Sequence, residues 1–248
     1  TNAEGTASTG LKSFDSDGFT LGTGSDENGN SANFVSWNWL AGVDAGSSNT
    51  DGSITSTVSA NTTAGFSIVS YTGTASAGAT VGHGLGVKPD MIITKARAIA
   101  DNWGVYHKSL GATKGLYLNT TNAEITSSAY YNNTEPTSTL VTLGDNEATN
   151  DNDTMIMYAF AEKQGYSKFG SYIGNGSTDG TFVYTGFKPA WVMSKRTDST
   201  NSWRIFDNKR PGFNSSSFNF VHANLANAED SGDVMDLNSN GFKVRTNS

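Results

Sequence analysis

The fold is decided by two stretches, GFSIVSYTGTASAGATVGHGLGVKPDMIITKARAIADNWGVYHK (residues 65–108) and GYSKFGSYIGNGSTDGTFVYTGFKPAWVMSKRTDSTNSWRIFDNK (residues 165–209). The two stretches share a series of residues at a constant separation of 100 positions: Pro89 and Pro189, Lys95 and Lys195, Trp103 and Trp203. After one-residue shifts they also share two further pairs: Tyr71 and Tyr172, Lys108 and Lys209. A period near 100 residues is the length of one β-sandwich domain. The sequence therefore predicts at least two units of one architecture.

The composition indicates that these units are built from strands. Of the 248 residues, 35% are hydrophobic and only 16% are charged, and there are 28 glycines. Few helix formers and many turn formers favour short strands joined by tight loops. An aromatic content of 11% supplies large side chains for a core. We expect an all-β protein of tandem antiparallel β-sandwich domains, jelly-roll or lectin-like, related by an internal repeat of about 100 residues.

Charge and residue usage exclude several classes of function. The net charge is −7 and Lys and Arg form no run, which argues against nucleic acid as a partner. No stretch approaches the roughly 20 apolar residues of a membrane helix, so membrane insertion is not expected. The absence of cysteine removes disulfides, thiol nucleophiles and thiolate metal sites. The sequence starts at Thr1 with no signal-peptide pattern, which suggests a processed or partial product.

A short motif recurs and suggests the unit boundaries. Thr1–Glu4 (TNAE) reappears as residues 121–124, and its core reappears as residues 227–229. We expect a first unit at residues 1–121 and a second at residues 122–248, the latter ending in the opening strand of a further unit. Residues 43–64 are a Ser/Thr/Gly-rich insertion of the first unit, and the pattern fits either a surface hairpin or a mobile linker.

Each unit is expected to contain about seven strands. Residues 18–22 and 34–39 should form the first hairpin, with residues 140–144 and 155–160 as the counterpart. In this alignment Trp37 and Trp39 correspond to Tyr158 and Phe160, bulky residues two apart that share one strand face. Two central strands should follow each proline, and the paired ranges are residues 91–95 and 191–195, then 103–107 and 203–207.

Catalytic motifs are missing from the sequence. The three histidines, His83, His107 and His222, do not fall at equivalent positions of the two units, and no Gly-x-Ser-x-Gly, HExxH or Walker pattern occurs. The glycine-rich residues 82–86 precede a proline turn and open no helix, which favours a structural role. The carboxylates that a glycosidase would need lie in polar loops, where solvated turn acids explain them: Glu124, Glu135, Asp145, Glu147 and Glu162. No enzyme is predicted.

One loop offers oxygen ligands for calcium. Residues 144–153 contain Asp145, Asn150, Asp151 and Asp153, but they lack the glycine and terminal glutamate of an EF-hand. Hairpin loops favour the same residue types without any ion, so a calcium site and a plain polar loop are the two interpretations. Calcium is the one cofactor under consideration.

One aromatic cluster suggests a glycan site. Tyr130, Tyr131, Asn132 and Asn133 combine rings that could stack on a sugar with amides that could hydrogen-bond around it. Adjacent residues of a strand point to opposite faces, so one tyrosine should face outward. In the alternative interpretation one ring is core and the other is an isolated surface tyrosine.

Several long phrases give the chain a family resemblance, and they lie at residues 37–42, 49–73, 81–93, 106–121 and 160–199 (among them WNWLAG, VGHGLGVKPDMII and YHKSLGATKGLYLNTT). They resemble the repetitive all-β modules of virion structural proteins, including tail-fibre-like ones, from marine tailed bacteriophages. The resemblance implies a non-enzymatic component of the virion surface, and so an extracellular location, as a tail fibre, spike or capsid decoration. It carries over no catalytic residue.

The same resemblance implies the partners, which are other virion proteins and host cell-surface polysaccharide. Fibres are commonly homotrimers, so a homo-oligomer such as a trimer is expected, although no residue pattern specifies three chains. The alternative function is a secreted carbohydrate-binding or carbohydrate-active module, and a third is a pure scaffold.

Overall fold

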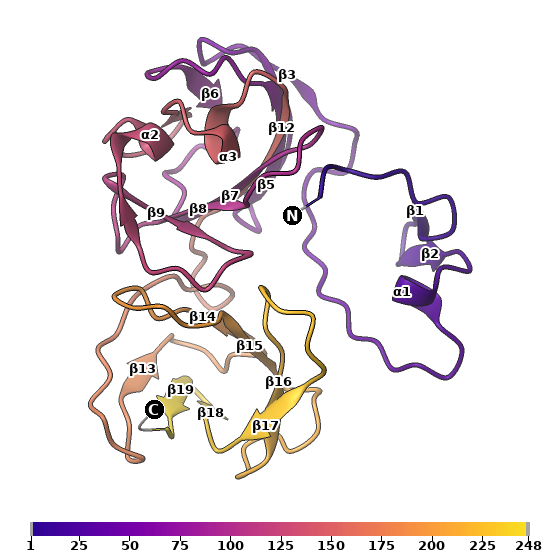
Figure 1. Cartoon of the computed structure of the whole chain (residues 1–248), viewed down its shortest axis with the longest axis vertical. Helices are drawn as coiled ribbons and strands as arrows, with labels where there is room; N and C mark the ends of the chain where they lie inside the picture. The colour runs from indigo at the N-terminus through magenta and orange to yellow at the C-terminus, as the bar shows by residue number, and fades with distance from the viewer. Residues whose placement is uncertain (1, 247–248) are drawn as a thin grey trace.

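The computed structural model describes residues 2–246 and has three parts (Figure 1). An N-terminal segment extends to the right, a central unit lies at the top and a C-terminal unit at the bottom. All paired strands are antiparallel apart from one isolated parallel bridge between Ile54 and Val81, so the protein is all-β as predicted. Residues 1, 247 and 248, the outermost positions of the two predicted units, lie outside the described residues.

An eight-stranded antiparallel sheet forms the central unit, in the order β10-β9-β8-β7-β12-β5-β4-β3. Its strands are β3 (Ser47–Asn49), β4 (Ser56–Asn61), β5 (Phe66–Thr72), β7 (Met91–Ala96), β8 (Gly104–His107), β9 (Lys114–Tyr117), β10 (Ile125–Thr126) and β12 (Thr154–Phe160). Strand β12 lies in the middle and pairs with β5 along all seven of its residues and with β7 along six. The last strand in sequence therefore joins two halves of the sheet.

This topology corrects the predicted domain boundary. A division between residues 121 and 122 would separate β10 and β12 from the sheet in which they pair. The prediction was wrong because sheet membership depends on distant partners, whereas the recurring TNAE motif marks only a local segment. Of the two interpretations of residues 43–64, the hairpin is confirmed, since β3 and β4 pair with each other at the sheet edge.

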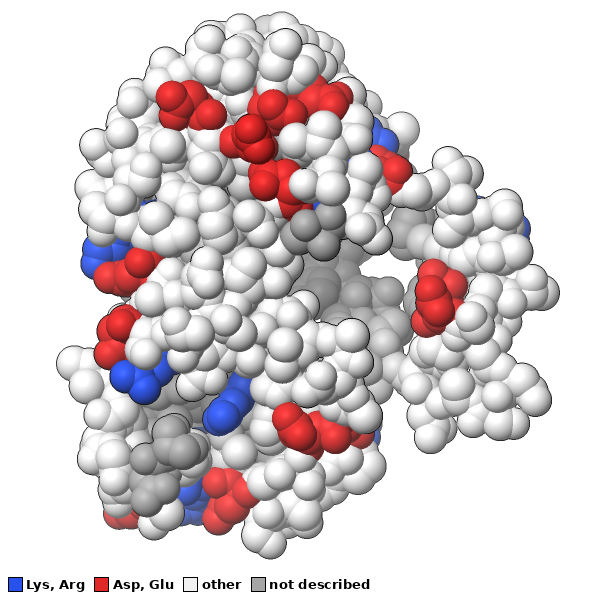
Figure 2. All heavy atoms as spheres, in the orientation of Figure 1, with Lys and Arg blue, Asp and Glu red and all other residues white. Residues whose placement is uncertain are grey.

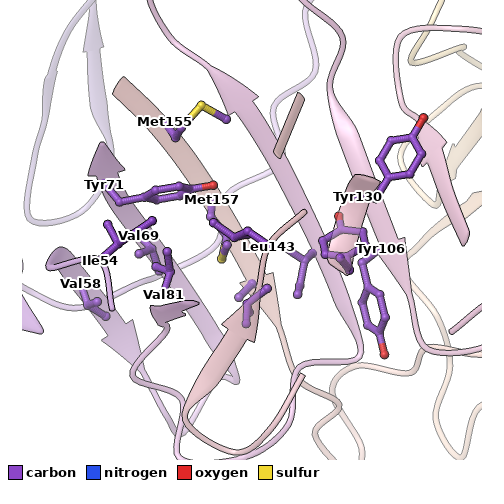
Figure 3. Packing of buried hydrophobic residues seen from close by; sticks show 14 of the residues in the cluster. Ile54, Val58, Val69, Tyr71, Val81, Tyr106, Tyr130, Leu143, Met155 and Met157 are labelled. Carbon is purple, nitrogen blue, oxygen red and sulfur yellow. The ribbon is translucent and has the colours of Figure 1, made fainter. Parts of the chain in front are cut away.

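The hydrophobic core of the central unit lies on one face of this sheet (Figure 3). Strand β12 contributes Met155, Met157 and Ala159, which alternate with more exposed residues and are fully buried. This is the period-two pattern of a strand with one face in a core. The face is covered by the pair β6 (Thr80–Gly82) and β11 (Leu140–Thr142) and by two single-turn helices, α2 (Ser128–Tyr131) and α3 (Glu147–Asn150).

Smaller sheets make up the C-terminal unit. Its strands are β13 (Phe182–Tyr184), β14 (Trp191–Ser194), β15 (Arg204–Asp207), β16 (Phe218–Phe220), β17 (Asp230–Gly232), β18 (Met235–Asn238) and β19 (Gly241–Val244). They form the groups β13-β19-β18, β14-β15 and β16-β17 around a second core. Within residues 2–246, β14 pairs only with β15, and no named strand lies between β12 and β13.

The outer face of the central sheet packs against the C-terminal unit. Met91, Val105 and Leu116 form a shared apolar cluster with Trp203, and Met193 packs against it. The Trp203 indole Nε1 donates a hydrogen bond to the backbone oxygen of Tyr117 at 2.9 Å. Burying large apolar side chains in this way stabilises the contact by about 25 cal/mol per Å² removed from water.

The N-terminal segment contains the hairpin β1 (Leu11–Phe14) and β2 (Phe19–Leu21) and the helical turn α1 (Ser25–Asn28). The prediction of a strand at residues 34–39 was wrong, because these residues belong to no strand. Alternation is a local property, and a strand also needs a partner for its backbone N–H and C=O groups.

Hydrogen bonds in the N-terminal segment recur in the central unit. The Asn28 side chain donates from Nδ2 to the Gly22 oxygen at 2.7 Å, and the Asn150 side chain donates to the Gly144 oxygen at 2.7 Å. Both glycines lie so close to a backbone carbonyl that a Cβ would approach it within 2.3 Å at Gly22 and 1.9 Å at Gly144. The segment from β2 to α1 thus shares this hydrogen bond and this close glycine contact with the segment from β11 to α3.

Shortening a buried side chain of β12 is expected to destabilise the central unit. Met157→Ala should lower the free energy of unfolding by about 2–5 kcal/mol, since it leaves a cavity between β5 and β7. The matched control is Ile173→Ala, whose side chain is 88% exposed and whose loss should cost less than about 0.5 kcal/mol. Urea denaturation of the three proteins measures both values, and equal stability of the two variants would contradict the role of β12.

Candidate functional site

The tyrosine pair predicted as a glycan site lies in the core. Tyr130 and Tyr131 are 2% and 0% exposed, so the prediction that one of them faces outward was wrong. The Tyr130 ring lies 5.8 Å from that of Tyr117, and the Tyr131 ring lies 5.4 Å from that of Tyr106, both in T-shaped contacts. Neither ring presents a face on which a sugar could stack.

Helix formation explains why both rings are buried. The Ser127 hydroxyl accepts a hydrogen bond from the Ala129 N–H and caps α2, which turns both tyrosines towards the sheet. Asn132 and Asn133 have φ values of 48° and 52°, the left-handed conformation that asparagine tolerates best after glycine. The Asn132 N–H closes the helix on the Ser128 oxygen. The serine cap was the sequence signal for this turn of helix.

The residues predicted to bind calcium serve different purposes. Asn150 is fully buried, and its Oδ1 accepts a hydrogen bond from the Thr74 N–H at 2.8 Å. Its Nδ2 donates to the oxygens of Ser76 and Gly144. Asp145 is exposed, Asp151 is half-buried, and Asp153 accepts from the Thr154 N–H. Among residues 2–246 no group of three or more His, Cys, Asp or Glu side chains could hold a metal ion.

Glu135 is held by several donors in the central unit. Its carboxylate accepts hydrogen bonds from Lys88 Nζ at 2.7 Å, Tyr106 Oη at 2.6 Å and the Ala112 N–H at 2.7 Å. Partial burial acts to raise the pKa of Glu135, but the donors, led by Lys88 and Tyr106, outweigh it and leave the pKa below its ordinary value. A carboxylate held in this way connects loops and is poorly suited to act as a proton donor.

A cluster that sequence reasoning missed lies between the N-terminal segment and the C-terminal unit. The Trp39 ring packs edge-on against Trp191 at 5.6 Å and against Phe160 at 6.2 Å. The Arg210 guanidinium lies 5.6 Å from the Trp37 ring, a cation–π contact. We call these residues, Trp37, Trp39, Trp191 and Arg210, the Trp39 cluster. Only the bulk of Trp37 and Trp39 was visible in the sequence, and their partners Phe160, Trp191 and Arg210 lie more than about 120 residues away.

Two polar atoms of the Trp39 cluster are buried without a hydrogen-bond partner among the described residues. They are Trp191 Nε1 and Arg210 Nη2. The Arg210 side chain is only 1% exposed, and its other nitrogens bond to Asp207 and Glu229. A buried donor without a partner costs about 1–3 kcal/mol, so these two donors destabilise this edge of the C-terminal unit.

The surface carries mixed charges and a few exposed rings. On the face shown in Figure 2, several Asp and Glu side chains gather on the upper part of the central unit, and elsewhere Lys and Arg side chains lie beside Asp and Glu. Phe182 and Tyr184 are 44% and 66% exposed and lie two residues apart on β13, so they share one face of that strand. Within the described part of the chain, no helix has the length and apolar character to cross a membrane.

The fold and these surfaces define an all-β protein of several antiparallel sheets. The chain belongs to the family described as "Domain of unknown function (DUF7483)", which matches it over residues 1–248. No curated protein and no solved structure matches the chain significantly.

Replacing Asn150 with alanine tests whether its side chain stabilises the fold by hydrogen bonds or by binding calcium. Asn150→Ala should lower the free energy of unfolding by about 1–3 kcal/mol, since the three hydrogen bonds of this buried side chain are lost. The loss should be the same in excess EDTA and in excess calcium chloride, with exposed Asp145→Ala as the control. A calcium-dependent rise in the melting temperature that both substitutions abolish would show that the loop binds the ion.

Acid should weaken the fold through His83. Its ring is fully buried, and this burial lowers the pKa of His83 below its ordinary value. The unfolded chain binds the proton more readily, so stability is complete above about pH 6.5 and falls as the pH drops through and below that value. His83→Gln should make the free energy of unfolding fall less steeply between pH 7.5 and 5, because up to about one fewer proton is taken up on unfolding. Burial also lowers the pKa of His107, so some slope should remain; an unchanged slope would contradict the prediction.

Proposed function

We propose that the protein is a non-enzymatic structural component of a bacteriophage virion surface, as a tail fibre, spike or capsid decoration. The proposal is carried by the resemblance of long phrases to marine phage structural modules, and these phrases run through both units at residues 37–42, 49–73, 81–93, 106–121 and 160–199. In this function the protein acts by stable folding and repeated display, with other virion proteins as partners and homo-oligomers as its assembled form.

The arrangement of the strands supports a modular origin. Strands β7 and β14 both begin two residues after a shared proline, and β8 and β15 both begin directly after a shared tryptophan. The backbone N–H of Trp103 donates a hydrogen bond to the Asn119 side-chain oxygen, and the backbone N–H of Trp203 donates to the Asn224 side-chain oxygen in the same way. We infer that both units descend from one β-sandwich of jelly-roll or lectin-like type that was copied in tandem.

A second function, carbohydrate binding, is favoured by the pair of exposed rings on β13. Phe182 and Tyr184 offer adjacent apolar faces at the rim of the C-terminal unit, the arrangement on which pyranose rings stack. In a virion protein these rings would contact host polysaccharide. In a secreted carbohydrate-binding module they would be the binding site itself.

Localisation tests the structural function. Antibodies raised against the 248-residue protein, used in immunogold electron microscopy of purified phage particles that carry this chain, should label fibres, spikes or the capsid surface. Labelling confined to the particle-free fraction of the lysate would contradict the proposal.

Retention on bacterial surface polysaccharide tests the second function. Phe182→Ala and Tyr184→Ala should each reduce retention, because the loss of a stacked aromatic ring lowers the binding free energy by about 1–3 kcal/mol. The control is Phe14→Ala, which removes a ring that is 82% exposed on the N-terminal hairpin. Equal retention of all three variants would exclude β13 as the glycan-contacting strand, and new reducing ends would indicate a carbohydrate-active enzyme.

A further inference from the structure

Among its described residues, the C-terminal unit has no counterpart of β12, the strand that completes the sheet of the central unit. In the central sheet β12 lies between β5 and β7 and pairs with both. The C-terminal counterpart of β7 is β14, and residues 167–173 are the counterpart of β5. Strand β14 pairs with β15 alone, and residues 167–173 belong to no named strand, with Tyr172 and Ile173 40% and 88% exposed. An open strand edge of this kind is a template for another strand.

The N-terminal segment carries a sequence of the β12 type without a partner. Residues 34–39 (FVSWNW) align with Met155–Phe160 of β12, and the turn before them shares with the turn before β12 one hydrogen bond, from an asparagine side chain to a glycine oxygen. Phe34, Val35 and Trp39 are 49%, 47% and 40% exposed. These residues have the alternation of a strand and belong to none, so their backbone groups are available for pairing.

The known register of β12 predicts how this segment would pair with β14. In the central sheet Phe160 lies opposite Met91, and Met157 lies opposite Thr94. Transferred through the two alignments, Trp39 would lie opposite Trp191 and Ser36 opposite Ser194. The first of these pairs already touches in the structure, with the two rings 5.6 Å apart.

We propose that residues 34–39 of a second copy of this chain pair antiparallel with the open edge of β14, between β14 and residues 167–173. This is strand addition to a sheet edge, in which main-chain hydrogen bonds provide affinity and side-chain pockets provide register. Trp191, on β14 itself, and Arg210 carry buried donors, Nε1 and Nη2, that lack partners among residues 2–246. The inference rests on strand pairing and stands independently of the virion function.

The chain's own segment is held away from this position. Its Trp37 lies against Arg210, beyond the Trp191 end of β14, whereas the β12-like register requires Trp37 beside Met193. The N-terminal segment that carries these residues contacts the central unit near both of its ends, through the ion pair of Glu4 with Arg97 and at Gly42, where a Cβ would lie 2.7 Å from the Ser59 hydroxyl oxygen. One chain therefore brings Trp39 to Trp191 and still leaves the edge of β14 unpaired. The strand of a second copy would take the place of this Trp39 and add the backbone pairing that the single chain lacks.

Each copy carries one donor segment and one acceptor edge. Such a head-to-tail contact joins copies into rings or open filaments, depending on the rotation between neighbours. The assembled state should therefore depend on protein concentration.

Disulfide trapping tests this pairing directly, because the chain has no cysteine of its own. The variants Ser36→Cys and Ser194→Cys are purified separately, mixed and oxidised. Opposite residues of an antiparallel pair have Cα atoms about 4.5–5.5 Å apart, within the range of a disulfide. The mixture should give about tenfold more covalent heterodimer than a control mixture of Ser36→Cys with Thr200→Cys, an exposed loop position, because pairing raises the local thiol concentration. Melting curves of the single variants confirm that each is folded.

The double variant Ser36→Cys/Ser194→Cys distinguishes a second copy from the same chain. Pairing between copies gives a ladder of covalent oligomers on a non-reducing gel. An intramolecular disulfide in a monomer would overturn the proposal in favour of closure within one chain. Equal heterodimer yields in the two mixtures would overturn it altogether.

Discussion

The pairing of β12 with both β5 and β7 is the interaction on which the rest of the structure depends. It joins strands that are close in sequence, from β3 to β5 and from β7 to β10, into one sheet. It also places Met155, Met157 and Ala159 at the centre of the larger core. Loop-closure entropy opposes so distant a pairing, and the apolar area buried along both edges of β12 offsets it. The outer face of the same sheet then forms the platform for Trp203 and the C-terminal unit.

Local features of this structure could be predicted from the sequence, and non-local ones could not. Pro89 and Pro189 located the strands that follow them, because a proline ends ladder pairing wherever the chain folds. Residues 34–39 have the alternation of a strand, yet they find no partner in the single chain. The TNAE motif suggested a boundary at residue 121, but the central sheet extends across it, since β12 pairs with strands about 60–90 residues earlier.

The candidate sites show the same limit. Tyr130 and Tyr131 were treated as strand neighbours, and the Ser127 cap places them on a helical turn with both rings buried. The acidic loop near Asn150 has the composition of a calcium loop, but the Asn150 amide joins three backbone groups. The Trp39 cluster was unpredictable because it unites residues 37, 39, 191 and 210 across two parts of the fold. The chain belongs to a family described as a domain of unknown function, and the proposed virion function rests on the phrases that resemble phage structural modules.

Hydrogen exchange at single-residue resolution tests the central claim most directly. If β12 joins the two halves of the sheet, the amides of β5, β7 and β12 should exchange last and together, with a protection free energy equal to that of global unfolding. Edge and neighbouring strands such as β3, β10 and β14 should exchange earlier, through local opening. Exchange of the β12 amides before those of β8 or β14 would contradict the account, because the sheet would then hold together without its central strand.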